Sequence, residues 1–443
     1  RASAAPVQDS TPGDSAPANA IDLETALKLA RVSSPRVAAM RAAEDAARAD
    51  LAAARVAWLP TVRLGASYHF LDGAIQESGG TRLSLQRSAA FVGSGAGAAA
   101  AGPTPLPGVS LHVDLASAIF DPLARKQDVR AMEAVTRAAE ADVALAVSVA
   151  YYELVRQHGR LQIARQATQE SATLVSTMES FAQTGEGLQS NASRALVAFR
   201  LRQAEEHTAQ ADLARATARL AVLLHLEQPD AWALRPALDE LRPIDVVTSE
   251  ADVAALVTRA NARRSELQAH DAVIAGAEAS LRKERLGVLL PTLSGGASGG
   301  GFAGNTGANP GGLAGRGEFL FALYWEVENL GAGHVARARR ERAQLRRARS
   351  EKESVVDTIT IQVREAHADL EAARLRIDAT HAAVAPAQRA YDLDRQRVFE
   401  KHGLPVELLQ SLDALVEART RHLDALVDFN VAQHQLLYAL GGP

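Results

Sequence analysis

The sequence predicts a mainly α-helical protein with long antiparallel coiled-coil hairpins and four amphipathic strands suited to a membrane. Three observations predict this fold: heptad-like helical segments, short stretches with a two-residue hydrophobic period, and a repeat of the whole element order. In the last quarter, Ile359, Val363, Ala366, Leu370 and Ala373 recur at alternating steps of four and three, the signature of packed helices. This helix is about 70 residues long and would span roughly 100 Å.

Composition narrows the class of protein. The chain has 443 residues, a formal net charge of -4 and no cysteine. The charge argues against a general nucleic-acid binder, and the missing cysteine excludes disulfides and thiolate metal sites. The sequence contains no run of 18 or more apolar residues, so it predicts no transmembrane helix. Residues 1–20 are rich in Pro, Ser and Ala, and we expect a disordered tail, as after removal of a signal peptide; a shortened chain would look the same.

The first repeat covers residues 21–226. Its expected elements, in chain order, are two helices up to Trp58, a strand at 61–71, a long exposed loop at 72–107, a strand at 108–120 and a helical hairpin at 121–226. The two strands show apolar and polar residues in strict alternation. Asp121-Pro122 is a typical start for the first helix of the hairpin. Gly185 and Gly187 mark its turn.

The second repeat covers residues 251–442 and follows a proline-containing linker at 227–250. Its expected elements are a helix, strands at 291–303 and 317–328, and a helical hairpin at 331–440 that turns at Gly403. Leu59-Pro60-Thr61 reappears as Leu290-Pro291-Thr292, about 230 residues later. The order of elements therefore occurs twice, which indicates an internal duplication.

Four strands with one apolar face cannot close a barrel by themselves. The long helices cannot fold back to cover such short strands, so lipid is the expected partner of the apolar faces, provided that every edge is paired. Three chains would give a 12-stranded barrel, within the known range. The polar faces, with Arg63, His69, His112, Asp114, Glu326 and Glu328, are then expected to face an aqueous lumen. Trp58, Phe120, Tyr324 and Trp325 lie near strand ends, where an aromatic girdle is expected.

Several motifs together make the chain similar to the TolC family of outer-membrane efflux proteins. They are the paired Leu-Pro-Thr junctions, the post-strand turns Phe120-Asp121-Pro122 and Asn329-Leu330-Gly331, and the segment from Gly403 to Ser411. The resemblance covers about residues 21–442. It implies a homotrimer in the outer membrane of a Gram-negative bacterium: a 12-stranded barrel continued by an α-helical tunnel across the periplasm. It further implies a periplasmic adaptor protein and an inner-membrane pump of the RND, ABC or MFS class, and no cofactor.

In that family the hairpin tips close the periplasmic end of the tunnel. The resemblance carries the acidic gate role to Glu407, while Gln410 stands where a second acid is common, and Ser193, next to Arg194, replaces the acid of the first tip. Gly185, Gly187, Gly403 and Leu404 are the expected adaptor contacts. Glu407 has a simpler interpretation as an acid favoured in the first turn of a helix.

Other features favour ordinary structural roles. The basic run from Arg337 to Arg349 is interrupted by Glu341 and is interpreted as a solvated helix face, with anionic lipid headgroups as the alternative. The histidines show no metal-ligand spacing, and no catalytic constellation is evident, so we expect no enzyme. A soluble periplasmic coiled-coil adaptor or spacer is the main alternative, and a scaffold lying on membranes through amphipathic helices is the third. One-sided strands favour the channel.

Overall fold

The computed structural model describes residues 20–96, 106–226, 235–236, 242–247, 252–400 and 402–442. The chain forms two compact units, each built from separate segments. The first unit contains Arg1–Arg41, Ala134–Leu267 and Ser354–Pro443, and the second contains Ala42–Glu133 and Gln268–Glu353. Both units are therefore assembled from the two halves of the sequence.

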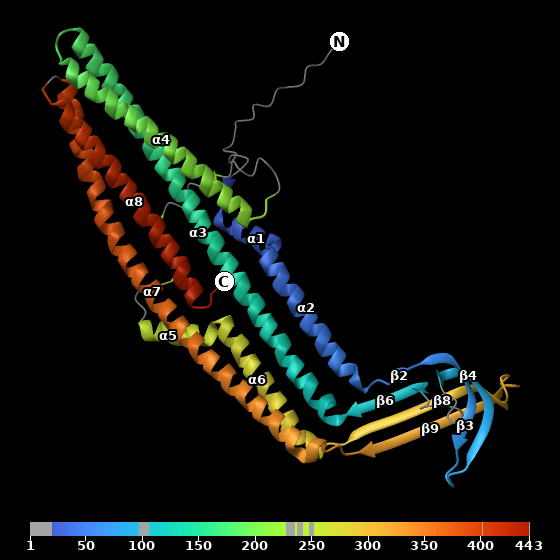
Figure 1. The fold of residues 1–443 in the computed structure, drawn as a ribbon. Helices are drawn as coiled ribbons and strands as arrows, with labels where there is room; N and C mark the ends of the chain where they lie inside the picture. Colours follow the sequence, from blue (N-terminus) through green and yellow to red (C-terminus); the bar gives the residue numbers. More distant parts are fainter. Residues whose placement is uncertain are drawn as a thin grey trace, which may run out of the picture. The chain divides into compact units, whose positions relative to one another are not determined.

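The order of helices occurs twice along the chain. The first half contains α1 (Leu23–Ser33), α2 (Pro35–Arg55), α3 (Leu115–Gln183) and α4 (Gln189–Leu223), and the second half contains α5 (Val253–Arg263), α6 (Ser265–Leu286), α7 (Ala332–Phe399) and α8 (Pro405–Ala439). The long helices α3 and α7 have 69 and 68 residues, and α4 and α8 have 35 each. Figure 1 shows α4 folded back along α3 and α8 folded back along α7.

The first unit has three hydrophobic cores along its helices. The predicted seam is confirmed: Ile359, Val363, Leu370 and Ala373 of α7 are buried against α5 and α8. A second core joins α1 to α3 and α4 around Tyr151, Leu154 and Leu220. A third joins the ends of the two hairpins. Apolar residues at heptad spacing are buried in these cores, and this burial stabilises long helices that are not stable alone.

The strand expected at 108–120 ends earlier than predicted. Strand β6 covers Val109–Asp114, and helix α3 begins at Leu115. The Asp114 carboxylate accepts hydrogen bonds from the backbone N–H groups of Ala116 and Ser117, both at 3.1 Å, so it caps the helix. Pro122 lies inside α3 and does not start it. The prediction that Asp121 begins the helix was therefore wrong.

The second unit contains an antiparallel sheet. Some of its strands lie end to end, so that the sheet is four strands wide. Its strands are β2 (Thr61–Val62), β3 (Leu64–Gln76), β4 (Arg82–Ala96), β5 (Leu106–Pro107), β6 (Val109–Asp114), β8 (Thr292–Thr306) and β9 (Ala314–Tyr324). Strand β3 pairs with β4, while β6 and β4 pair in succession with one edge of β8, and β9 pairs with the other edge. Short β2 pairs with β6. In the first unit, β1 (Ala20–Ile21) pairs in parallel with β7 (Arg235–Pro236).

The long exposed loop expected at 72–107 is mostly strand. Strand β3 continues to Gln76, the chain turns at Gly80, and β4 returns from Arg82 to Ala96. A backbone hydrogen bond of 3.0 Å from Glu77 N–H to the Thr81 carbonyl closes this turn. The segment is rich in Gly, Ala and Ser, which have weak strand propensity, so composition indicated a loop where strand pairing decides the conformation.

Glycine permits close approach of β4 and β8. Gly93 and Gly300 are paired in register. A Cβ atom on Gly300 would lie 2.3 Å from the Val92 carbonyl oxygen, whereas a Cβ on the neighbouring Gly299 would meet no atom within 4 Å. The pairing of these strands therefore depends on Gly300 in particular.

We predict that Gly300→Ala lowers the free energy of unfolding by about 1 to 3 kcal/mol because the new methyl group forces the two backbones apart. The matched variant Gly299→Ala has room for its methyl group and should unfold at the wild-type temperature or slightly above it. Thermal unfolding of the purified variants in detergent measures both. Equal midpoints for the two variants would contradict the close approach.

Candidate functional site

The sheet presents an uncovered apolar face. Large apolar side chains alternate along β3 and β9 and are exposed: Leu64 and Phe319 are 79% and 78% exposed, and Tyr68, Phe70, Phe321 and Leu323 are also exposed. Strands of 13 and 11 residues are long enough for a tilted membrane span of about 9 to 11 residues. The alternation predicted from the sequence is thus present as an apolar surface that the described residues leave exposed.

Polar groups gather at the strand–helix junction of the second unit. His112, Asp114 and Glu326, three of the residues expected on the polar face, line one pocket of about 230 Å³. Lys283, Glu284, His334 and Arg337 are the other ionisable residues of its lining. Arg63, the residue between β2 and β3, donates a 2.6 Å hydrogen bond to the Ser110 hydroxyl. The pocket therefore gathers acidic, basic and imidazole side chains on one concave polar surface.

Both edges of the sheet lack a partner among the described residues. Strand β3 pairs only with β4, and β9 pairs only with β8. Each neighbouring pair along the lines β3, β4, β8 and β9 is antiparallel. The two edge strands therefore run in opposite directions, so that the β9 edge of one copy can pair antiparallel with the β3 edge of another.

Exposed aromatic and aliphatic side chains surround this junction. Trp58 is in the short helix after α2, Tyr324 ends β9, and Trp325 follows it and donates a 3.3 Å hydrogen bond to the Leu289 carbonyl. Phe120 lies in α3, not at a strand end as predicted. Leu330, in the left-handed turn before α7, is 99% exposed. Such amphipathic side chains at the ends of strands are typical of a membrane–water interface.

The two hairpin tips of the first unit share one turn geometry. The N–H groups of Glu186 and Gly187 donate to the Phe181 carbonyl, as those of His402 and Gly403 donate to the Arg397 carbonyl. A Cβ on Gly187 would lie 2.9 Å from the Phe181 Cβ, and one on Gly403 would lie 3.0 Å from the Arg397 Cβ. Gly187 and Gly403 are thus required by the turn itself.

Exposed leucines follow these two turn glycines. Leu188 and Leu404 are the residues before α4 and α8, and both are well exposed. Gly185 has a positive φ of 76° and an open surrounding. Leu404 was singled out from the sequence, while its counterpart Leu188 was missed. Comparing the two Gly-Leu pairs would have found it.

The predicted gate residues lie on the outer turns of the tip helices. Glu407 and Gln410 are exposed in the first turns of α8, and Ser193 and Arg194 are exposed in α4. The Ser193 hydroxyl donates to the Gln189 carbonyl at 3.1 Å. Around them the tips pack through Leu408, Leu412, Ala192 and Ala195. The structure brings the two tips together in one core, with the polar gate residues outside it.

Polar contacts below the tips join the two hairpins, and sequence reasoning missed them. The Tyr391 hydroxyl of α7 donates a 2.7 Å hydrogen bond to the Glu170 carboxylate of α3, and Arg395 lies 3.9 Å from the same carboxylate. Burial and the Glu170 carboxylate raise the pKa of Tyr391 well above its usual range. Glu170 and Tyr391 lie at similar distances along the chain from their own turns, the one signal that could have paired them.

A second set of contacts joins α3 to α8 and further connects α8 to α4. Arg156 contacts Asp424 at 3.1 Å and Asp428 at 2.6 Å, and Arg160 contacts Asp424 at 2.7 Å. Arg202 of α4 pairs with Asp413 of α8. Nearby carboxylates, which outweigh burial, raise the pKa of Arg156. The hairpins of the first unit are thus connected by ion pairs at several levels.

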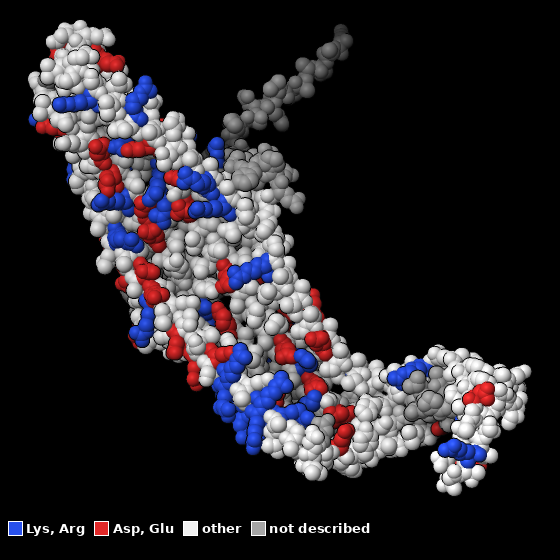
Figure 2. Space-filling view, viewed as in Figure 1, with Lys and Arg blue, Asp and Glu red and all other residues white. Residues whose placement is uncertain are grey.

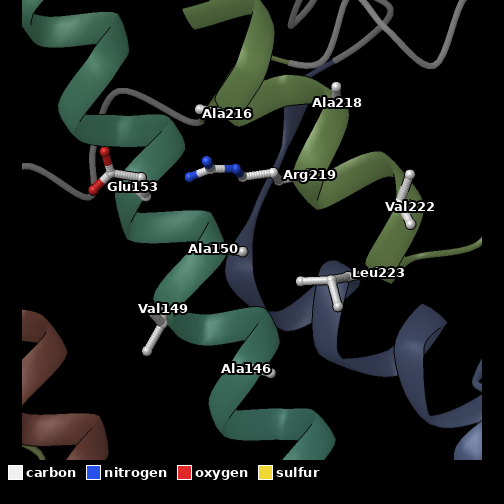
Figure 3. A pocket seen from close by; sticks show the side chains of 9 residues that line it. All are labelled: Ala146, Val149, Ala150, Glu153, Ala216, Ala218, Arg219, Val222 and Leu223. Atoms are coloured by element: carbon white, nitrogen blue, oxygen red, sulfur yellow. The ribbon is translucent and has the colours of Figure 1, made fainter. Parts of the chain in front are cut away.

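An apolar groove lies between α3 and α4 in the first unit. Figure 3 shows its lining, which includes Ala146, Val149, Ala150, Ala216 and Val222, and its volume is about 720 Å³. Glu153 and Arg219 are its charged members. Small apolar side chains of this kind suit helix packing, and they offer no nucleophile or general base. In the described part of the chain, no group of three or more metal-ligating side chains occurs, and no helix is long and apolar enough to cross a membrane.

Comparison with solved structures identifies the fold. A membrane protein from Pseudomonas aeruginosa matches 95% of this chain and 90% of its own, with 19% identity and a TM-score of 0.75. The CmeC outer membrane channel of Campylobacter jejuni matches 95% and 85%, with 14% identity and a TM-score of 0.76. The open state of the MtrE outer membrane channel of Neisseria gonorrhoeae matches 95% and 89%, with 19% identity and a TM-score of 0.73. The chain has the fold of these outer-membrane channels. No family model and no curated protein matches the sequence.

This fold confirms the predicted combination of long helical hairpins and membrane-type strands. In the described residues, the strands differ from the prediction in two ways. Strand β4 lies where a loop was expected. The other strands have different bounds, most clearly the longer β3 and the shorter β6. The three proteins named above are two outer-membrane channels and one membrane protein, so this fold gives no support to an enzyme.

We predict that Tyr391→Phe lowers the free energy of unfolding by about 1 to 2 kcal/mol because the buried Glu170 contact is lost. The double variant Tyr391→Phe/Glu170→Gln should be less destabilised than the sum of the single variants, since each removes the same hydrogen bond. Denaturant unfolding of the four proteins measures this coupling. Strict additivity would show that the two side chains do not interact.

Histidines in the first unit predict a loss of stability in mild acid. Burial lowers the pKa of His434, which packs on Tyr152, below its usual value of 6.5. Burial also lowers the pKa of His422 and of His158. As pH falls below about 6.5, the unfolded chain binds these protons before the folded chain does, so the free energy of unfolding decreases.

We therefore expect a lower unfolding temperature at about pH 5 than at about pH 7.5, and a smaller difference between these pH values in His434→Gln. The exposed His402→Gln serves as the control and should retain the wild-type difference. Thermal unfolding at both pH values gives the answer, and an unchanged pH dependence in His434→Gln would contradict the assignment.

Proposed function

We propose that three copies of this chain form a channel through the outer membrane of a Gram-negative bacterium, with a helical tunnel on its periplasmic side. The observation that carries the proposal is the sheet with one apolar face and two unpaired, oppositely directed edges. In hydrocarbon, every backbone polar group needs a partner, so such a sheet is stable there only when closed. Three copies close it with 12 strands.

The channel is proposed to export small molecules or proteins delivered by a periplasmic adaptor and an inner-membrane RND, ABC or MFS pump. The proposed adaptor contacts are the tip residues Gly185, Gly187, Gly403 and Leu404, together with Leu188. Leu188 and Leu404 support this role because they are exposed at corresponding positions of the two tips. The outer-membrane channels that share the fold support the location.

Glu407 is proposed to line the narrow end of the tunnel. Its exposure in the first turn of α8 supports this role, and threefold symmetry would bring three carboxylates near one axis. A ring of carboxylates attracts cations and repels anions. Arg194 of the adjacent tip is exposed as well, so the local charge at this end is mixed.

Planar-bilayer recordings of the detergent-purified protein test both the channel and the gate. We expect small, discrete, cation-selective conductance steps. Glu407→Gln should lower the cation-to-anion permeability ratio severalfold and weaken block by multivalent cations. Glu400→Gln, which removes an exposed acid at the end of α7, is the matched control and should retain wild-type selectivity.

The outcomes separate the two claims. Absence of conductance in the wild type, together with a monomer soluble without detergent, would reject the channel and favour a soluble adaptor or spacer. Channels whose selectivity is unchanged in Glu407→Gln would reject only the role of Glu407. Equal loss in both variants would assign selectivity to the general charge of the tips.

A further inference from the structure

The first turns of α7 have two faces with different surroundings. Arg337 faces the polar junction: it contacts Glu284 at 2.9 Å and lines the pocket that contains His112, Asp114 and Glu326. Farther along, Arg349 and Lys352 make ion pairs with Glu278 and Asp271 of α6, at 2.9 and 2.6 Å. The charges of these basic residues are therefore paired with carboxylates of the same unit.

Arg339, Arg342 and Arg346 form a separate basic stripe. At about 100° per residue, they lie about 140° to 200° around the helix axis from Arg337, on the opposite face. All three are exposed, and none makes a hydrogen bond or ion pair with another residue in the described part of the chain. Figure 2 shows Lys and Arg side chains gathered over the first turns of α7.

The basic stripe is unfavourable for the helix by itself. Its members are three, four and seven residues apart, so that like charges are neighbours on the helix surface. No Asp or Glu stands three or four residues before or after any of them. An ordinary solvated helix face interleaves opposite charges at these positions. An external anion would remove the repulsion.

An apolar surface precedes the basic stripe. Val335, four residues before Arg339, lies on the same face and is 52% exposed. Before it come the fully exposed Leu330 and the exposed Val327 and Trp325 at the end of β9. Along the chain, exposed aromatic and aliphatic side chains after β9 are therefore followed by exposed arginines. This order is typical of the passage from hydrocarbon to headgroups.

We propose that Arg339, Arg342 and Arg346 bind the phosphate groups of anionic phospholipids in the leaflet from which the helices emerge. The inference rests on the proposed membrane channel. The guanidinium group matches phosphate geometry in a bidentate manner. A headgroup layer is roughly 5 to 8 Å thick, and at 1.5 Å per residue Arg339 lies about 6 Å beyond Val335, within such a layer. Arg342 and Arg346 lie about 10 and 16 Å beyond Val335, so we expect their contributions to decrease in that order.

Spin-labelled lipids test this assignment in the intact protein. The protein is reconstituted in phosphatidylcholine bilayers, and the motionally restricted fractions of spin-labelled phosphatidylglycerol and phosphatidylcholine are compared. We expect phosphatidylglycerol to be preferred by about two- to fivefold. The preference should approach one in Arg339→Gln/Arg342→Gln/Arg346→Gln and at high salt. Arg346→Gln alone should have a smaller effect than Arg339→Gln alone.

A control variant with the same change in net charge distinguishes an effect of the basic stripe from an effect of net charge. Arg259→Gln/Arg364→Gln/Arg389→Gln removes three exposed arginines of the first unit and should keep the wild-type preference. A wild type without preference, or equal effects of the two triple variants, would overturn the inference while leaving the channel intact. Binding to peptidoglycan sacculi that depends on the stripe, without lipid preference, would also overturn it. No motionally restricted lipid of either kind would reject the membrane channel itself.

Discussion

The sheet of the second unit is left with two unpaired edges by the described part of its own chain, and the rest of the structure depends on this constraint. Its edge strands β3 and β9 carry backbone groups without a partner among the described residues. Its apolar face includes Leu64 and Phe319, both more than three-quarters exposed. In water such a sheet would aggregate through its edges. In a lipid bilayer, closure by identical copies satisfies the edges and lipid covers the apolar face.

The helices recur in the two halves of the chain together with the strands. Each pair of strands is followed by a long helix, α3 or α7, and a returning helix, α4 or α8. Heptad spacing of small and medium apolar residues buries one seam of each helix without a thick core. Polar contacts then specify which helices meet: Glu170 with Tyr391, and Asp424 with Arg156 and Arg160. Contacts of this kind between partly exposed side chains are individually weak.

The sequence predicted the parts of the fold that depend on periodicity. The seam from Ile359 to Ala373, the one-sided strands and the two hairpin turns were all found because they repeat locally. The segment at 72–107 was misjudged because the pairing of β4 with β8, more than 200 residues apart, decides its conformation. The start of α3 was misplaced because Asp121-Pro122 and Asp114 both resemble helix caps. The backbone N–H groups of Ala116 and Ser117 donate hydrogen bonds to Asp114, which is therefore the cap. The Glu170–Tyr391 contact was missed because it joins different hairpins.

Disulfide cross-linking between edge strands tests the central claim most directly. The chain contains no cysteine, so every bond would join introduced residues. Cysteines are placed in pairs on the outward faces of the two edges, at Leu64, Ala66 or Phe70 of β3 with Phe319, Phe321 or Leu323 of β9. Closure by three copies predicts that at least one pair gives covalent dimers and trimers in native membranes, and no larger species. Absence of cross-linked chains for every pair, or a ladder beyond three chains, would contradict it.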